Sequence, residues 1–238
     1  MPRRCSFEQR ERHMDQKIAD ELIRAGLELR HDEDGLVLEG NGMALRASFD
    51  DMKRRLLPGK LNHELLVRAC KVKGVAAPRL VDATAGLGQD SLLLAAAGFT
   101  VTLFECNPVI ALLLADAVER ARLDPELAEA ASRMHVVEDD SATALCTLDE
   151  SVDVVYLDPM FPGRTKSAAV KKKFQLLHRL EMPCQDEKAL LDAALGAHPR
   201  KIVIKRPIKG PYLAGVKPSY ELCGKAVRYD CIVIARDS

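Results

Sequence analysis

The amino-acid sequence predicts an α/β fold: a mostly parallel sheet with connecting helices, a C-terminal antiparallel hairpin and a small N-terminal α+β appendage. Three observations support this prediction. From residue 79 onward, short apolar runs alternate with helical stretches, as in strand–helix–strand units. Two final apolar runs flank Gly224 and Lys225 with no helix between them, which indicates a hairpin at the sheet edge. Residues 1–75 follow neither pattern, so we divide the chain into an appendage over 1–75 and a main domain over 76–238.

The appendage is expected to hold two helices and a hairpin. Gly26 can end the first helix, Gly40-Asn41-Gly42 provides the turn of the hairpin, and Asn62 is suited to cap the start of the second helix. The expected elements are a helix over 14–25, strands over 36–38 and 43–47, and a helix over 62–73.

The main domain is expected to hold five strands in sequence with helices between them, followed by the hairpin. The strands are short and rich in Val, Leu and Ile, whereas the helices are longer and rich in Ala and Leu. The expected strands are 80–83, 100–104, 134–137, 152–157 and 201–205, the helices are 91–97, 108–122 and 186–196, and the hairpin strands are 220–223 and 226–235.

Composition limits the classes of protein to consider. The chain has 238 residues, 47% of them hydrophobic, and 35 basic residues balance 35 acidic ones. This is a globular composition with no apolar run long enough to span a membrane and no secretory leader, so we expect a cytoplasmic protein. The seven cysteines and six histidines show no metal-ligand spacing, and we expect neither a metal site nor a disulfide framework.

A glycine-rich turn follows the first strand of the main domain. The strand ends at Asp82, and Gly86 and Gly88 precede the next helix. In open α/β sheets, ligands bind at the carboxyl ends of the strands, and glycines let the backbone approach them. Ser91 stands where a dinucleotide fingerprint would have its third glycine, which disfavours a hydride-transfer dehydrogenase. A tight turn that binds nothing is the alternative for this segment alone.

Acidic residues end the next two strands as well. Glu105 lies 23 residues after Asp82, near the offset at which a carboxylate meets the hydroxyl pair of a ribose. Asp140 and Ser141 follow the third strand, where an acid could accept an adenine amino hydrogen. Taken alone, either acid could instead be a solvated group at a strand end.

The most specific motif is Asp158-Pro159-Met160-Phe161-Pro162. It resembles the D/N-P-P-Y/F signature of methyltransferases that act on exocyclic or amide nitrogens. Such a nitrogen is a poor nucleophile because its lone pair is delocalised. Asp158 and the carbonyl of Pro159 can accept its two hydrogens, which favours a lone pair directed at a methyl donor, and Phe161 offers a face on which a base can stack. The alternative is a proline-bounded strand exit with Phe161 in the core.

Taken together, these motifs resemble the S-adenosylmethionine-dependent methyltransferases with a Rossmann-like seven-stranded sheet. More narrowly, the chain is similar to the ribosomal RNA small subunit methyltransferase J family of 16S rRNA guanine-N2 methyltransferases over about 79–235. The residues that carry this closer match are VDATAGLG (81–88), Asn107-Pro108, YLDPMFP (156–162), Lys166-Ser167-Ala168 with Val170-Lys171-Lys172, and Val203–Pro207.

The resemblance implies S-adenosyl-L-methionine as the methyl donor and 16S rRNA or the small ribosomal subunit as the partner. It also implies donor contacts, in addition to Asp82 and the two glycines, from Gln89, Asp90, Glu105, Cys106, Asp140, Ser141 and Asp158. Gln89 and Cys106 stand where the family has arginines, and Asp140 stands where it has a serine. These departures remove positive charge from the rim of the expected site.

The charges are unevenly distributed along the chain. Residues 76–158 hold 4 basic and 15 acidic residues, whereas residues 159–217 hold 13 basic and 4 acidic ones. Because the basic block follows the Asp158–Pro162 motif, we expect it to contact RNA phosphates beside a flipped base. The expected RNA-binding residues are Arg164, Lys166, Lys171, Lys172, Lys173, Lys205 and Arg206.

Two other functions remain open from the sequence. An amino methyltransferase acting on another RNA, on DNA or on a protein glutamine would share the donor motifs. A catalytically silent Rossmann-like RNA-binding module is the other alternative, although the intact Asp158-Pro159-x-Phe161 motif argues against it.

Overall fold

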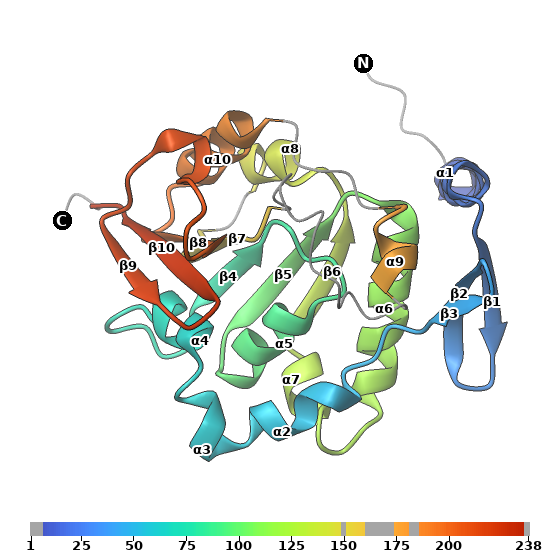
Figure 1. Ribbon diagram of the computed structural model, residues 1–238, viewed down its shortest axis with the longest axis horizontal. Helices are drawn as coiled ribbons and strands as arrows, with labels where there is room; N and C mark the ends of the chain where they lie inside the picture. The colour runs from blue at the N-terminus through green and yellow to red at the C-terminus, as the bar shows by residue number, and fades with distance from the viewer. Residues whose placement is uncertain (1–6, 149–150, 160–173, 181–185, 236–238) are drawn as a thin grey trace.

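The computed structural model describes residues 7–148, 151–159, 174–180 and 186–235 (Figure 1). At its centre is a seven-stranded sheet in the order β6-β5-β4-β7-β8-β10-β9. Strands β4 to β8 are parallel, and β10 runs antiparallel to both β8 and β9. The predicted fold class is therefore confirmed. The strands are β4 (Arg79–Asp82), β5 (Thr100–Glu105), β6 (Met134–Glu138), β7 (Val154–Leu157), β8 (Lys201–Pro207), β9 (Tyr220–Cys223) and β10 (Val227–Val233).

Helices cover both faces of the sheet, and successive residues of a strand alternate between the two faces. In β7, Val154 and Tyr156 join one buried cluster, whereas Val155 and Leu157 join the other. The first cluster packs against α4 (Leu65–Cys70), α5 (Gln89–Ala96), α6 (Pro108–Arg122) and α7 (Ala128–Ala131); the second packs against α8 (Ser141–Cys146) and α10 (Glu187–Gly196).

Helix α6 has the bounds that the sequence predicts. Asn107 caps its start by accepting hydrogen bonds from the backbone N–H groups of Val109 and Ile110, and Pro108 occupies the first helical position. Proline is well suited there because its missing N–H would have no partner within the helix. This helix start also fixes the end of β5 next to it.

The N-terminal segment forms α1 (Phe7–Ala25) and a three-stranded antiparallel sheet of β1 (Glu28–Asp32), β2 (Gly35–Gly40) and β3 (Met43–Leu45). Gly26 ends α1 with a φ of 63°, and Asn41 and Gly42, both with positive φ, make the turn between β2 and β3, so both predictions are confirmed. Strand β1 was not predicted, because its sequence ELRHD has no apolar alternation. The chain continues through η1 (Asp50–Met52), α2 (Lys53–Leu56) and α3 (Pro58–Leu61).

The predicted cap at Asn62 is wrong. Asn62 follows the end of α3, and its amide donates a hydrogen bond to the Pro58 carbonyl. Helix α4 begins three residues later at Leu65, with Glu64 before it. Pro58 starts the short additional helix α3, and the amide of Asn62 serves that helix instead of α4.

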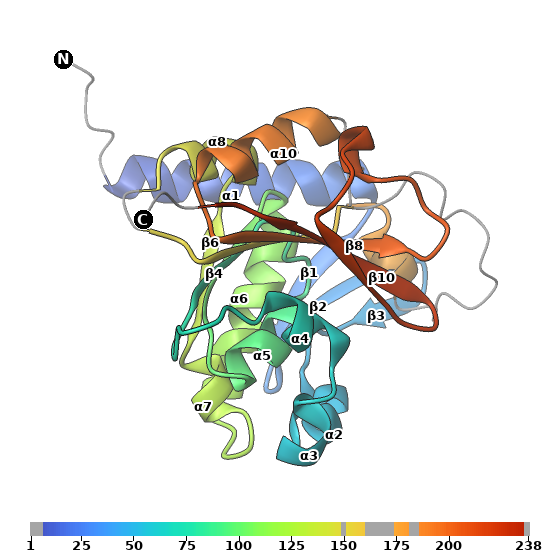
Figure 2. The same cartoon turned by 90° about the vertical axis from the view of Figure 1, so that its left-hand side faces the viewer.

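The N-terminal segment packs against the main domain without a break in the core. Leu27, Leu38 and Leu45 belong to the same buried cluster as Leu113 and Leu114 of α6. The two views place α1 at the same end of the molecule as α8 and α10, with α2 and α3 at the opposite end (Figures 1 and 2). A boundary at residue 75 remains a prediction. No helix among the described residues is long and apolar enough to cross a membrane.

Candidate methyl-donor and acceptor site

A cavity of about 830 Å³ opens at the carboxyl ends of β4 and β7. The chain leaves β4 for β5 and β6 on one side and returns to β7 on the other, so this is the point at which the strand order reverses. Ligands of open α/β sheets bind at such a point. The cavity is lined by Pro159 and by all ten residues predicted to contact the donor: Asp82, Gly86, Gly88, Gln89, Asp90, Glu105, Cys106, Asp140, Ser141 and Asp158.

Asp82 organises the turn between β4 and α5. Its side chain is buried and accepts hydrogen bonds from the backbone N–H of Thr84 (3.1 Å) and from the hydroxyl of Ser91 (2.5 Å). Burial raises the pKa of Asp82 to about 7, although these two hydrogen bonds oppose the shift. The hydroxyl of Thr84 in turn accepts the backbone N–H of Asp158 at 2.6 Å, so the turn also positions the end of β7.

Glu105 connects the glycine-rich turn to the end of β5. Its Oε2 accepts the backbone N–H of Gly86 at 2.9 Å, and its Oε1 accepts that of Asn107 at 2.8 Å. Both carboxylate oxygens are therefore held in place and keep lone pairs that can accept ribose hydroxyls.

The two glycines of the turn differ in what surrounds them. Both have positive φ, 54° at Gly86 and 71° at Gly88. A Cβ at Gly88 would lie 2.6 Å from Cδ1 of Leu114, whereas a Cβ at Gly86 would meet no atom within 4 Å. Gly88 is therefore needed for packing, and Gly86 keeps space open at the cavity.

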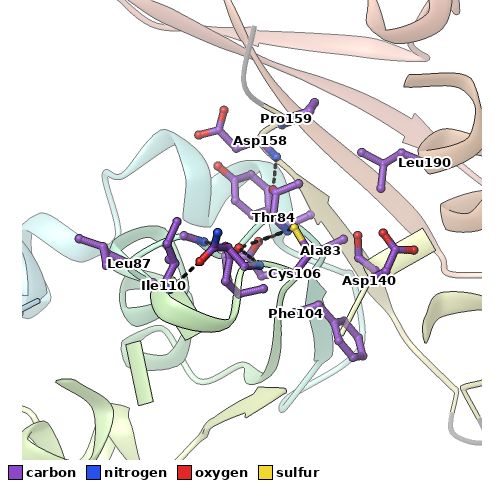
Figure 3. Close-up of a pocket in the computed structure, with 18 of the residues that line it drawn as sticks. Ala83, Thr84, Leu87, Phe104, Cys106, Ile110, Asp140, Asp158, Pro159 and Leu190 are labelled. Atoms are coloured by element: carbon purple, nitrogen blue, oxygen red, sulfur yellow. Dashed lines mark hydrogen bonds between the residues drawn. The ribbon is translucent and has the colours of Figure 1, made fainter. Parts of the chain in front are cut away.

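Asp140 lies on another side of the cavity, near Phe104 and Leu190, with Leu87 and Ile110 opposite (Figure 3). It caps α8 by accepting hydrogen bonds from the backbone N–H (2.9 Å) and the hydroxyl (3.0 Å) of Thr143. A fixed carboxylate beside the apolar side chains of Phe104 and Leu190 is suited to an adenine ring and its amino group.

Asp158 and Pro159 follow β7 at the top of the cavity in Figure 3. The side chain of Asp158 is 37% exposed, and its Oδ2 lies 2.9 Å from Nζ of Lys205. The same ammonium lies 2.7 Å from Oδ2 of Asp90, which also accepts the hydroxyl of Tyr156 at 2.7 Å. Burial lowers the pKa of Lys205, but the two carboxylates outweigh it and hold this pKa above its ordinary value.

Two of the predicted RNA-binding residues form internal ion pairs in the structure. Lys205 lies inside the cavity, where its ammonium is held by Asp90 and Asp158. The side chain of Arg206 is buried on the other face of β8, where it donates to the carbonyl of Pro211 and pairs with Glu187 of α10. Arg206 cannot reach a phosphate at the surface because it is buried, so its predicted RNA contact is wrong, whereas the RNA contact of Lys205 stays a prediction.

The remaining predicted residues lie outside the described part of the chain. They are Phe161, Arg164, Lys166, Lys171, Lys172 and Lys173. Within the described ranges, no group of histidine, cysteine, aspartate or glutamate side chains is arranged to hold a metal ion.

Sequence reasoning missed Thr84 and Tyr156 and assigned Lys205 to a different role. A signal existed for Tyr156, because a tyrosine within a fully buried strand needs a partner for its hydroxyl. The alternation of side chains in β8 also offered a signal for Lys205. Position 205 shares the face of Val203, which packs on the α5 side of the sheet, and Asp90 lies in the first turn of α5. Thr84 gave no sequence signal.

The cavity fits a cationic nucleoside such as S-adenosylmethionine. Glu105 and Asp140 present fixed carboxylates to the cavity, and most of the charged groups that line it are acidic. Acidic groups attract a sulfonium and an ammonium electrostatically. The volume lies within the range of small-molecule pockets.

Comparisons with known proteins agree with this interpretation. Residues 12–234 match the family of SAM-dependent methyltransferases. The chain is similar to ribosomal RNA small subunit methyltransferase J of Thioalkalivibrio sulfidiphilus, at 42% identity over 213 residues that cover 83% of this chain and 84% of that protein. The Pseudomonas aeruginosa protein of the same name is 48% identical over 168 residues, which cover 70% of this chain and 64% of that protein. A solved SAM-dependent methyltransferase from Neisseria gonorrhoeae is 35% identical, with a TM-score of 0.70 over 86% of this chain and 81% of that one.

Proposed function

The chain belongs to the S-adenosylmethionine-dependent ribosomal RNA small subunit methyltransferase J family, and on this premise we propose that it methylates the exocyclic N2 of a guanosine in bacterial 16S rRNA. The observation that carries the proposal is the placement of Asp158 and Pro159 beside the cavity. A carboxylate held by Lys205 and an adjacent carbonyl are acceptors for the two hydrogens of an amino group.

The reaction needs positioning and electrostatics more than acid–base chemistry. The bound donor supplies a methyl group on a positively charged sulfur, which makes it a strong electrophile. Asp158 accepts one amine hydrogen and the Pro159 carbonyl accepts the other, so that the nitrogen lone pair points toward the methyl group. After transfer, the nitrogen loses a proton to Asp158 or to water. Glu105 and Asp140 would hold the nucleoside part of the donor, and the Gly86–Gly88 turn would hold its amino-acid part.

The charge distribution supports a nucleic-acid acceptor. Thirteen basic residues against four acidic ones follow Asp158 in residues 159–217. Basic side chains beside a site for an extruded base suit phosphate contacts. A cytoplasmic location follows from a ribosomal substrate and is part of the proposal.

The test is transfer of labelled methyl groups from S-adenosylmethionine to small-subunit particles and to free 16S rRNA that lack their own modifications. Nucleoside analysis should find the label in N2-methylguanosine. Asp158→Ala should lower turnover by about three orders of magnitude or more without unfolding the protein, because the acceptor nitrogen loses its orientation. Label in a different nucleoside, in DNA or in a protein glutamine would contradict the proposal, and so would wild-type turnover by Asp158→Ala.

A further inference from the structure

One ammonium group connects the donor side of the cavity to the acceptor side. Nζ of Lys205 lies 2.7 Å from Oδ2 of Asp90, which is in the first turn of α5 on the donor side. It also lies 2.9 Å from Oδ2 of Asp158, which belongs to the acceptor motif. The side chain is 22% exposed, so these contacts are largely shielded from solvent. We propose that Lys205 is the positioning residue of the methyl acceptor: it holds the Asp158 carboxylate ionised and oriented, and it fixes that carboxylate relative to Asp90.

The proposal rests on the proposed function and adds a residue to its mechanism. Without a cation between them, the carboxylates of Asp90 and Asp158 would be neighbouring like charges. Two carboxylates in that arrangement share a proton, because both cannot ionise without a penalty. A protonated Asp158 would present a hydroxyl donor to the amine, and a rotated Asp158 would turn its acceptor oxygen away from it. The ammonium removes that competition and keeps the carboxylate of Asp158 an acceptor for the amine hydrogen.

The groups around Lys205 come from three strands, one helix and the segment that follows β7. Tyr156 of β7 donates to Asp90, and the ring of Tyr229 on β10 lies near enough that Asp90, Lys205 and Asp158 all affect the pKa of its hydroxyl. At the end of β4, burial raises the pKa of Asp82, and the charges of Asp90 and Asp158 raise it further. Arg55 of α2 does not line the cavity, but its charge also interacts with Asp90 and Tyr229. Among the described residues that line the cavity, Lys205 is the cation shared by an otherwise acidic and phenolic cluster.

The main variant is Lys205→Met, with Lys205→Arg as the matched control that keeps the charge. Lys205→Met should lower kcat by about 100-fold, the effect of losing alignment at the reacting atoms, with a smaller change in KM for RNA. The acidic limb of its pH–rate profile should move up by about one pH unit, because the carboxylate pair now retains a proton at higher pH. Lys205→Arg should keep the limb near its wild-type position and recover part of kcat.

A second variant removes the like charge as well as the cation. In Asp90→Asn/Lys205→Met, the Asp90 charge beside Asp158 is gone together with the cation, so the acidic limb should return to within about 0.3 pH unit of its wild-type position while kcat stays low. This double variant also carries the test if Lys205→Met does not fold, because it leaves no uncompensated carboxylate pair in the cavity. Turnover at the wild-type level in the double variant would overturn the positioning role.

A measurement without RNA separates this inference from the proposed function. Titration of ¹³C-labelled aspartate carboxyl carbons by NMR, in the protein alone, should show proton uptake in Lys205→Met at a pH about one unit above that of the wild type. If wild-type protein fails to methylate 16S rRNA but the NMR shift is seen, only the substrate is wrong. Titrations that are unchanged in folded Lys205→Met would overturn the role of Lys205 whatever the substrate.

Discussion

At the scale of single residues, Asp82 is unusual because it is an ionisable carboxyl group that is almost completely buried. Its pKa is raised to about 7 because burial disfavours the charge. The ordinary value in an unfolded chain is about 4, so the native state binds the extra proton between about pH 4 and pH 7. Stability therefore falls as pH rises through that window, in the opposite direction to a salt-bridged carboxylate.

Asp82→Asn tests this linkage, because asparagine keeps an acceptor and cannot ionise. The free energy of unfolding of the wild type, minus that of Asp82→Asn, should decrease between pH 5 and pH 8 by on the order of 2 kcal/mol. Urea denaturation at several pH values measures it.

Ser91→Ala is the informative control for the Asp82 experiment. The Ser91 hydroxyl hydrogen bond lowers the pKa of Asp82, so removing it should move the pH-dependent window of stability upward. A difference between wild type and Asp82→Asn that stays constant with pH would show that Asp82 is charged in the native state throughout.

At the scale of elements, the turn between β4 and α5 separates a packing requirement from a binding requirement. Gly88→Ala would force a Cβ to 2.6 Å from Leu114 as well as a strained φ, and should cost about 2 to 4 kcal/mol of unfolding free energy. Gly86→Ala has open space and should cost only about 1 kcal/mol. Thermal and urea unfolding measure both costs.

The same pair of variants should rank differently in donor binding. The open space at Gly86 faces the cavity, so Gly86→Ala should weaken S-adenosylmethionine binding by about tenfold or more in calorimetry while the protein stays folded. An equal loss of stability at the two glycines, or normal donor affinity in Gly86→Ala, would contradict this division of roles.

The elements also show what local sequence can predict. Helix α6 has its predicted bounds because Asn107, Pro108 and the apolar pattern after them agree. The start of α4 was misplaced because Asn62 is an equally good partner for the carbonyl of Pro58 in the short α3. Strand β1 was missed because its pairing with β2, not its own composition, makes it a strand.

At the scale of the whole molecule, the sequence could predict which residues gather at the cavity, because parallel strands place their carboxyl ends at one edge. It could not show what each side chain does there. Lys205 and Arg206 are adjacent in a basic segment, yet one holds two carboxylates in the cavity and the other is buried against α10. That difference depends on which helices cover each face of the sheet, and it cannot be predicted from the number of charged residues.

A second basic segment lies at the other end of the molecule, before the main sheet begins. Residues 53–79 hold eight basic residues and one acidic residue, although the formal net charge is zero. Exposed members of that group, Arg54, Lys60 and Lys73, have no ion-pair partner within the described ranges. Helices α2 and α3 carry the first two at the end of the molecule opposite α8 and α10, which flank the cavity (Figure 2). They provide a matched control for Lys171–Lys173, which follow the Asp158–Pro162 motif and lie outside the described residues.

Replacing Lys171, Lys172 and Lys173 with alanine should weaken RNA binding and reduce the slope of log K against log salt by about 2 to 3, because each phosphate contact contributes about 0.7 to 0.9. Replacing Arg54, Lys60 and Lys73 with alanine removes the same charge and should change the slope by less than about 1, because those residues lie away from the acceptor site. Binding of a 16S rRNA fragment measured between 50 and 300 mM salt distinguishes the two. Equal slopes in the two triple variants would mean that RNA responds to the total charge of the protein, and that the basic block beside the acceptor motif has no local role.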